Sequence, residues 1–363
     1  MSAEKTYYMG VESLQPTCAM TVGRREPSTV SGQKIGCLAL IVAALLTGPA
    51  SALPKVITID DRNVFPESLD STSDGTLYIG GSNGRIYRAE KGRAYAEPWI
   101  LRENSGLHVG VRGVVTDPKS NTLWVCDNNG ESSSIFRFAL NSGLKKNSFD
   151  FPGGGHCNDI ALRDGAAYIT DTAKGRILKL APGGSQLSVW YTSDPADKSL
   201  DGISWAKDDR LYVNTVSSNH LIRIDVNRDG SSGKGIVLKT SRDLSQPDGL
   251  RRTRDGHLLM VEGRASRGGA LKDGRLEEVS INGDEATITI IRSGFEYSTA
   301  VTVVGETAWV LESKFDYHRN PILKGQDPGS FQIYPVRLPD LNGRHDKRPG
   351  RANETPSRSV HRE

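Results

Sequence analysis

One strand pattern returns six times along this chain at nearly equal intervals, and it limits the fold more than any other feature. A polar turn leads into a short strand with a large apolar centre at 73–80, 119–126, 163–170, 207–214, 254–261 and 304–311. The strand ahead of each turn starts at 67, 112, 158, 201, 248 or 298, so successive starts lie 43 to 50 residues apart. A steady period of about 40–50 residues is typical of the blades of a β-propeller.

Each repeat offers four strands, except the sixth, which lacks an outer one. The segment Lys55–Ile59 (KVITI) can supply that missing strand and pair the two ends of the domain. The sequence therefore predicts an all-β fold, a six-bladed β-propeller over residues 53–338 that is closed by an N-terminal strand. A β-sandwich and a seven-bladed ring are the alternatives. Even spacing argues against the sandwich, and few residues remain for a seventh blade.

Residues 1–52 lie outside the repeat and have the layout of a secretory signal peptide. Basic residues precede an apolar run over 35–46, and Ala-Ser-Ala at 50–52 matches a cleavage site. The apolar run is short for a membrane span. We expect an exported protein, secreted or periplasmic. An uncleaved N-terminal membrane anchor is the alternative, and Met20 is an alternative start.

The C-terminal segment 339–363 is basic and polar, and it is predicted to be a disordered tail. The formal net charge of the whole chain is +3, which gives no reason to expect a nucleic-acid partner. We expect a small-molecule substrate, no membrane contact beyond the export signal, and a monomer or weak dimer.

Two of the four cysteines, Cys126 and Cys157, lie outside the leader and fall on neighbouring repeats. In an oxidising compartment they could pair, and two buried free thiols are the alternative. No Cys-x-x-Cys or Cys/His spacing indicates a metal–thiolate site.

Four oxygen-bearing side chains occupy the same phase of the repeat, each just ahead of a first strand: Glu67, Asn158, Asp201 and Asp248. The inner strands of a propeller start at one mouth, so these groups are expected to meet. Three carboxylates together would repel one another unless a cation lay between them. Oxygen ligands suit one divalent ion, calcium first, with magnesium, manganese or zinc as alternatives. Each residue alone is also common in turns, so the hypothesis depends on the shared phase.

The same short motifs make residues 55–320 similar to the SMP-30/gluconolactonase (regucalcin-like) family. Glu67-Ser68, Asn158-Asp159 and Pro247-Asp248-Gly249 match that family's motifs in blades one, three and five. The resemblance implies a six-bladed propeller with one divalent metal and hydrolysis of lactones. It also implies that Glu67 and Asp248 are ligands, that Asn158 faces the site and that Asp248 acts as the base.

Two positions depart from the family pattern. Asp201-Gly202 stands where Asn-Gly is usual, and an extra carboxylate would make the metal a weaker Lewis acid. His156 stands where the family often has an arginine for a sugar acid, which puts a sugar-lactone substrate in doubt. Strictosidine-synthase-like proteins and paraoxonases share the six-bladed plan.

The resulting hypothesis is an exported, metal-dependent hydrolase of a lactone or related ester, working through a metal-activated water. The catalytic candidates are Asp248 and His156, although His156 could merely cap a glycine-rich loop. The candidates for substrate binding are Arg112, His156, Tyr297 and Ser298. Arg112 could instead form a salt bridge in the channel. A non-catalytic propeller with a structural metal is the second hypothesis, and no Gly-x-Ser-x-Gly elbow indicates a serine hydrolase.

Overall fold

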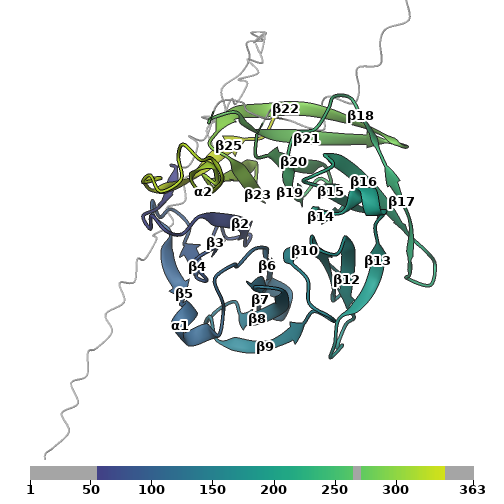
Figure 1. Ribbon diagram of the computed structural model, residues 1–363, viewed down its shortest axis with the longest axis horizontal. Coiled ribbons are helices and arrows are strands. Elements are labelled where there is room, and N and C mark those ends of the chain that lie inside the picture. The colour runs from purple at the N-terminus through teal and green to yellow at the C-terminus, as the bar shows by residue number, and fades with distance from the viewer. Residues whose placement is uncertain (1–54, 265–270, 340–363) are drawn as a thin grey trace, which may run out of the picture. The chain divides into compact units, whose positions relative to one another are not determined.

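The computed structural model describes residues 55–264 and 271–339, which form six small antiparallel sheets in a ring (Figure 1). Residues 1–54, 265–270 and 340–363 lie outside the described residues. The predicted signal peptide and nearly all of the predicted tail therefore lie outside them. The predicted six-bladed propeller is confirmed.

Each blade is a meander that runs from an inner strand to an outer strand. Blade 1 contains β2 (Pro66–Ser71), β3 (Leu77–Gly81), β4 (Ile86–Ala89) and β5 (Glu97–Ile100). Blade 2 contains β6 (Val114–Asp117), β7 (Thr122–Asn129), β8 (Ser132–Ala139) and β9 (Lys145–Asp150). Blade 3 contains β10 (Cys157–Arg163), β11 (Ala166–Asp171), β12 (Arg176–Leu180) and β13 (Ser188–Thr192).

The remaining blades repeat this plan with small changes. Blade 4 contains β14 (Leu200–Trp205), β15 (Leu211–Thr215), β16 (His220–Val226) and β17 (Ser232–Val237). Blade 5 contains β19 (Pro247–Arg252), β20 (Leu258–Glu262), β21 (Gly274–Asn282) and β22 (Glu285–Phe295), and β18 (Lys239–Thr240) pairs in parallel with β22. Blade 6 contains β23 (Ser298–Val304), β24 (Thr307–Glu312), β25 (Phe331–Arg337) and β1 (Ile57–Ile59).

Turn chemistry and burial explain why the repeat folds this way. Asp164 and Gly165, between β10 and β11, both have positive φ, 50° and 77°, as a tight hairpin turn requires. The second strand of blade 1, LYIGG, is buried along its whole length, because neighbouring blades cover both of its faces. A continuous apolar strand is therefore stable here, where an isolated sheet would expose one side.

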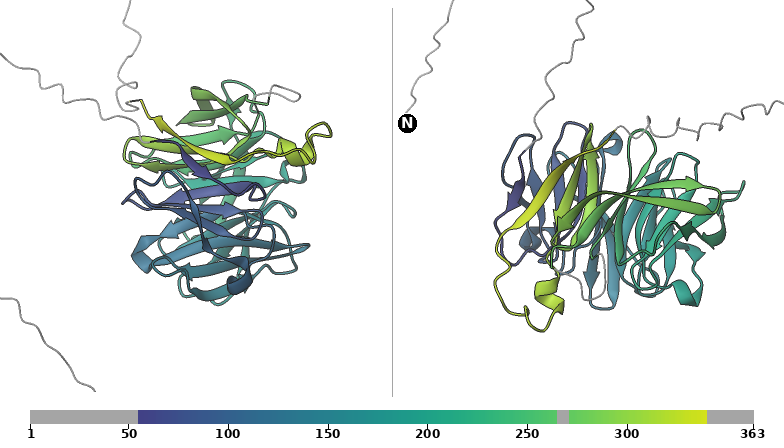
Figure 2. Two further views of the ribbon diagram at one scale, coloured as in Figure 1. Left: turned by 90° about the vertical axis from the view of Figure 1, so that its left-hand side faces the viewer. Right: turned by 90° about the horizontal axis from the view of Figure 1, so that it is seen from above.

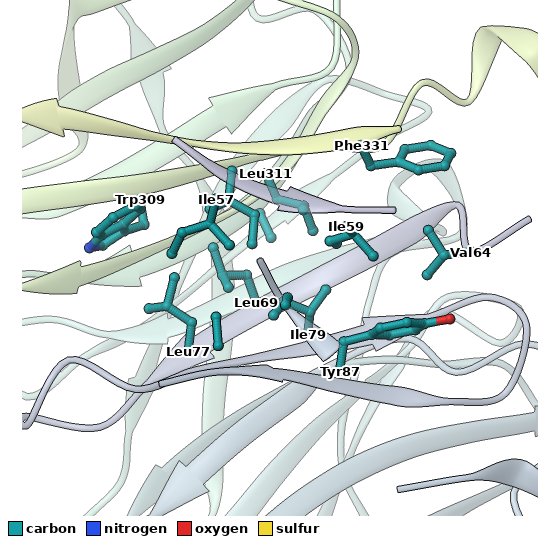
Figure 3. Close-up of a cluster of buried hydrophobic side chains, with 14 residues drawn as sticks. Ile57, Ile59, Val64, Leu69, Leu77, Ile79, Tyr87, Trp309, Leu311 and Phe331 are labelled. Atoms are coloured by element: carbon teal, nitrogen blue, oxygen red, sulfur yellow. The ribbon is translucent and has the colours of Figure 1, made fainter. Parts of the chain in front are cut away.

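The ring closes through the first strand of the chain. β1 pairs antiparallel with β25, with Ile57 opposite Ile333 and Ile59 opposite Phe331. Both isoleucines are buried in a cluster that joins blade 6 to blade 1 (Figure 3). Burying each side chain is worth about 1.5–3 kcal/mol, so the closing strand contributes packing as well as hydrogen bonds.

Blades 2 and 3 are joined covalently. A disulfide links Cys126 of β7 to Cys157 of β10, and both cysteines are completely buried. Of the two alternatives left by the sequence, pairing is the one observed.

Only two short α-helices, α1 (Arg102–Ser105) and α2 (Asp316–Arg319), occur among the described residues. None of the described helices is long and apolar enough to cross a membrane. Helix α2 lies in the loop between β24 and β25 and projects from one face of the ring (Figure 2). Since Ser298 at the start of β23 pairs with Glu312 at the end of β24, this loop leaves from the end at which the inner strands begin. We call that end the mouth.

Candidate active site at the mouth of the propeller

A β-bulge at the start of the inner strands sets the position of the candidate residues. In blades 1, 4 and 5 the first ladder pair is Pro66–Gly81, Leu200–Thr215 and Pro247–Glu262, and the register then shifts. The residues that follow these first pairs are Glu67, Asp201 and Asp248. Asn158 follows the equivalent pair in blade 3, Cys157–Asp171. Bulges re-aim side chains out of the regular ladder, and the four predicted residues indeed occupy equivalent positions.

Gly202 and Gly249, which follow Asp201 and Asp248, lie where two inner strands approach closely. Gly202 lies within β14, where a Cβ atom would come 2.2 Å from the Asp248 carbonyl oxygen of the next blade. Gly249 lies within β19, where a Cβ would come 2.6 Å from the Thr299 carbonyl oxygen. These Asp-Gly pairs are therefore strand residues at which two inner strands approach closely, and the turn interpretation of them is wrong.

In blade 6 the equivalent position belongs to Thr299 rather than to the predicted Ser298. The first ladder pair there is Ser298–Glu312, so the position after it is Thr299. Ser298 is completely buried and its hydroxyl donates to the Glu262 carbonyl at 2.8 Å. The Thr299 hydroxyl shares a hydrogen bond with the hydroxyl of Ser313.

The carboxyl groups of Glu67, Asp201 and Asp248 share one electrostatic environment. Burial raises the pKa of Glu67 to about 7, and the charge of Asp159 adds to the shift. Burial also raises the pKa of Asp201 well above its usual range, with Glu67 adding to the effect and a hydrogen bond from Asn158 opposing it. Burial, followed by the charges of Asp201 and Glu67, does the same to the pKa of Asp248. Side chains from blades 1, 3, 4 and 5 are thus brought together.

The donor types fit a hard divalent cation, but they do not form a closed coordination shell. All are oxygen donors, and no ion pair reaches Asp201 or Asp248 from within residues 55–264 and 271–339. Over the same ranges, no three histidine, cysteine, aspartate or glutamate side chains are already gathered so that they could hold a metal ion. Cation binding would therefore need these side chains to move together.

Arg112, the blade 2 candidate, contacts this group of carboxylates. Its Nε lies 3.9 Å from Oε1 of Glu67, and its Nη1 donates to the Ser82 hydroxyl at 2.8 Å. The guanidinium also lies 5.8 Å from the centre of the Phe315 ring. Arg112 therefore has a salt-bridge contact at the mouth, and its position also suits contact with an anionic substrate.

His156 is held at the mouth by its backbone. Its amide donates to Oδ1 of Asp171 at 2.9 Å, and the buried Asp171 is paired with Arg176 at 2.8 Å. The preceding Gly155 has φ 151°, and a Cβ there would come 2.3 Å from the Asp171 carboxylate. Burial, followed by the charge of Arg112, lowers the pKa of His156, so the imidazole is neutral at neutral pH.

A buried ion pair between blades 3 and 5 was missed by sequence reasoning. Arg251 of β19 makes a bidentate contact with Asp159 of β10, at 2.6 Å from Nη1 to Oδ2 and 2.9 Å from Nη2 to Oδ1. Oδ2 of Asp159 also accepts from the Ile203 amide of blade 4 at 3.1 Å. Asp159 is therefore the counter-ion of an arginine. No spacing in the sequence links these residues, which lie 92 positions apart.

A second polar contact ties blades 1, 2 and 6. Oδ2 of Asp70 accepts from the Thr116 amide at 2.6 Å, and Oδ1 accepts from the Thr302 hydroxyl at 3.2 Å. Burial raises the pKa of Asp70, and the charge of Arg251 opposes that rise. The inner strands are thus cross-linked by polar groups, so their starting ends are held in fixed relation.

The loop that carries α2 adds residues that the repeat could not reveal. Arg319 of α2 donates to the hydroxyl of Tyr297, a predicted substrate-binding residue. Burial raises the pKa of Tyr297 to about 12. Both side chains line a cavity of about 340 Å³, together with Gln246, Arg264 and Asp316. Because the loop between β24 and β25 lies outside the repeated strands, periodicity gave no signal for Arg319.

Comparison with known proteins supports the fold. The family model for the strictosidine synthase-like N-terminal region matches residues 51–89. No curated protein sequence matches this chain. The allergen Mala s 1 of Malassezia sympodialis has a similar structure, with a TM-score of 0.60 and 17% identity over 78% of this chain and 96% of that one.

Two similar structures carry enzyme names. A gluconolactonase from Xanthomonas campestris matches with a TM-score of 0.55 and 16% identity over 78% of this chain and 89% of that one. A luciferin-regenerating enzyme matches with a TM-score of 0.56 and 13% identity over 78% and 95%. At such identities the likeness concerns the fold. The resemblance to SMP-30/gluconolactonase-like propellers is confirmed at the level of the fold. The family-model match, over residues 51–89, is to the strictosidine-synthase-like proteins, which share the six-bladed plan.

Proposed function

We propose that this protein is a hydrolase of lactones or related esters. The observation that carries the proposal is a group of three carboxyl groups from three blades at the mouth, Glu67, Asp201 and Asp248. Burial raises the pKa of all three, and the charge of Glu67 adds to the rise at Asp201 and Asp248. Perturbed groups of this kind cluster at functional sites. The gluconolactonase of similar fold adds support for a lactone as the substrate class.

The proposal includes one divalent metal ion, calcium first. The residues that would hold it are Glu67, Asn158, Asp201 and Asp248. A cation bound by these oxygens would polarise a carbonyl group and lower the pKa of a water molecule. Three acidic donors suit a hard cation, because its charge offsets repulsion between the carboxylates.

The other steps belong to side chains of the chain itself. Asp248 takes the proton from the attacking water, since its raised pKa makes it a stronger base than an ordinary carboxylate. The neutral imidazole of His156 is the second acid–base group: it can take up the proton from the protonated Asp248 and, as imidazolium, pass it to the leaving alkoxide oxygen. The guanidinium of Arg112, beside Glu67, stabilises negative charge that develops on the substrate.

A panel of lactones tests the proposal. The wild type and Asp248→Asn are assayed with calcium, magnesium, manganese or zinc, and hydrolysis is followed by pH-stat. We expect turnover in the wild type and a loss of at least about 100-fold in the variant, as is common when a general base is removed. Asp229→Asn, in an exposed turn, is the matched control. No turnover by the wild type with any metal would reject the hydrolase.

A non-catalytic propeller that binds a ligand or protein is the second candidate function. A similar structure, the allergen Mala s 1, does not carry an enzyme name, and this favours the second candidate. Metal content of the purified protein, measured by mass spectrometry, separates the two when it is combined with the lactone panel. Metal without turnover supports the binding protein.

We also propose that the protein is exported and acts in a secreted or periplasmic location. The disulfide between Cys126 and Cys157 supports this, because disulfides persist in oxidising compartments. The intact mass of protein recovered from the periplasm or medium tests it. Cleavage after Ala52 is the expected result, and a full-length membrane-bound chain would contradict it.

A further inference from the structure

The cavity beside α2 is lined by two arginines, Arg264 and Arg319, which differ in whether a carboxylate pairs with them. Arg264 is paired with the buried carboxylate of Asp316. Arg319 is exposed, and no carboxylate of residues 55–264 or 271–339 lies within ion-pair distance of its guanidinium. Its Nη1 donates to the neutral hydroxyl of Tyr297 instead. The cavity therefore presents one guanidinium group without a direct ion-pair partner among those residues.

Aromatic rings hold that charge in place. The Arg319 guanidinium lies 5.0 Å from the centre of the Phe315 ring and 5.4 Å from that of Tyr297. Arg112 lies 5.8 Å from the same Phe315 ring. Two guanidinium groups therefore share one aromatic ring, and a planar cation fixed in this way is preorganised for an anion. The charge of Arg319 also acts on Glu67 and Asp248, so a ligand bound to Arg319 would lie beside the candidate active site.

Gln246 also lines this cavity, and its side-chain oxygen lacks a donor in the described part of the chain. Oε1 of Gln246 is buried and has no hydrogen-bond partner among the described residues. The backbone of Gln246 is fixed, because its amide donates to Asn219 at 2.8 Å and its carbonyl accepts from the Gly263 amide at 3.1 Å. An unpaired buried acceptor costs about 1–3 kcal/mol, and a turn of this side chain toward the cavity would let a ligand hydroxyl satisfy it.

We propose that this cavity binds a hydroxy-acid group, with a carboxylate on Arg319 and a hydroxyl on Gln246, and so selects lactones that carry a free carboxylate. This inference rests on the proposed hydrolase function, because it names the substrate class of that site. A bidentate arginine–carboxylate contact provides both charge and geometric selectivity. Arg319 is then a specificity residue, because it contacts the substrate away from the bond that breaks.

The test compares a lactone that carries a carboxylate, D-glucaro-1,4-lactone, with a neutral one, D-glucono-1,5-lactone. For Arg319→Gln we expect KM for the carboxylate lactone to rise about 10-fold or more relative to KM for the neutral lactone. A change in kcat, which follows from removing a charge near Glu67 and Asp248, should be the same for both lactones. Arg319→Lys should restore part of the loss, and Gln246→Leu should weaken binding less. Arg228→Gln, which removes an exposed charge elsewhere, is the control.

Binding of the ring-opened diacid D-glucarate, measured by isothermal titration calorimetry, gives a readout that does not need turnover. Tighter binding of glucarate than of the neutral alcohol D-glucitol, lost in Arg319→Gln, is the expected result. If Arg319→Gln binds glucarate as the wild type does, the inference is overturned even when lactones are hydrolysed. If glucarate binds through Arg319 but no lactone is hydrolysed, the proposed function fails and recognition of the hydroxy acid stands.

Discussion

Removing the disulfide between blades 2 and 3 should destabilise the ring by an amount that follows from chain length. Cys126 and Cys157 are 31 positions apart. In the chain-entropy description, opening a loop of this size raises the conformational entropy of the unfolded chain by about 12 cal/mol/K. This lowers the free energy of unfolding by about 3.7 kcal/mol at 25 °C. That is a large part of the net stability of about 5–15 kcal/mol that is typical of a folded domain.

The assay is urea unfolding followed by tryptophan fluorescence, with and without a phosphine reductant. Both sulfur atoms are buried, so the reduced sample is first unfolded and then refolded in the reductant. With an m-value of about 3 kcal/mol/M, the midpoint should fall by about 1.2 M. The double variant Cys126→Ala, Cys157→Ala should lose at least as much, because it also loses side-chain packing.

The double variant also serves as the control, because its midpoint should not respond to the reductant. The reasoning would be refuted if reduction moved the wild-type midpoint by less than about 0.2 M while mass spectrometry showed both thiols free. Such a result would mean that breaking the link gives the unfolded chain little additional entropy, because contacts between the two segments persist in the unfolded ensemble.

Three further predictions concern the inner strands and blade 5. Arg251→Gln should leave Asp159 buried without its counter-ion and cost about 3–5 kcal/mol in thermal unfolding, whereas an apolar replacement of both partners should cost less. Burial raises the pKa of Glu277 from 4.5 to about 7. Between these two pH values the folded state holds a proton that the unfolded state has lost. The free energy of unfolding should therefore fall by up to about 3 kcal/mol as pH rises from 4.5 through 7. Glu277→Gln should flatten that part of the stability profile, and an unchanged slope would contradict the assignment. Gly202→Ala, whose Cβ would come 2.2 Å from the Asp248 carbonyl oxygen, should lower the melting temperature and the hydrolysis rate together, and an unaltered rate would contradict the close approach.

The sequence predicted features that recur with the repeat. Blade number, the closing strand and the ring position of Glu67, Asn158, Asp201 and Asp248 all follow from the period, because equivalent positions in a ring converge. The assignment of Ser298 was one residue short, because the intervals between repeats vary from 43 to 50 residues and the period therefore does not fix a position to a single residue.

Features without a repeat were not predictable in this way. The pairing of Arg251 with Asp159 joins strands 92 positions apart and is decided by packing inside the ring. Arg319 lies in a loop outside the repeated strands, so no comparison between repeats could mark it. Whether Cys126 and Cys157 pair depends on the distance between two blades, and their Cα atoms lie 5.3 Å apart in the folded ring.

The close approaches at Gly113, Gly202 and Gly249 also bear on how such a site can evolve. At each one, backbone atoms of one blade meet the carbonyl group of a residue in the next blade, with no side chain between them. The angular spacing of the inner strands is therefore set by main-chain contact, independently of the residue that occupies the position before each glycine. Arginine occupies that position in blade 2 and aspartate occupies it in blades 4 and 5, on the same main-chain arrangement, so a lineage could change its chemistry at the mouth while the scaffold stays constant.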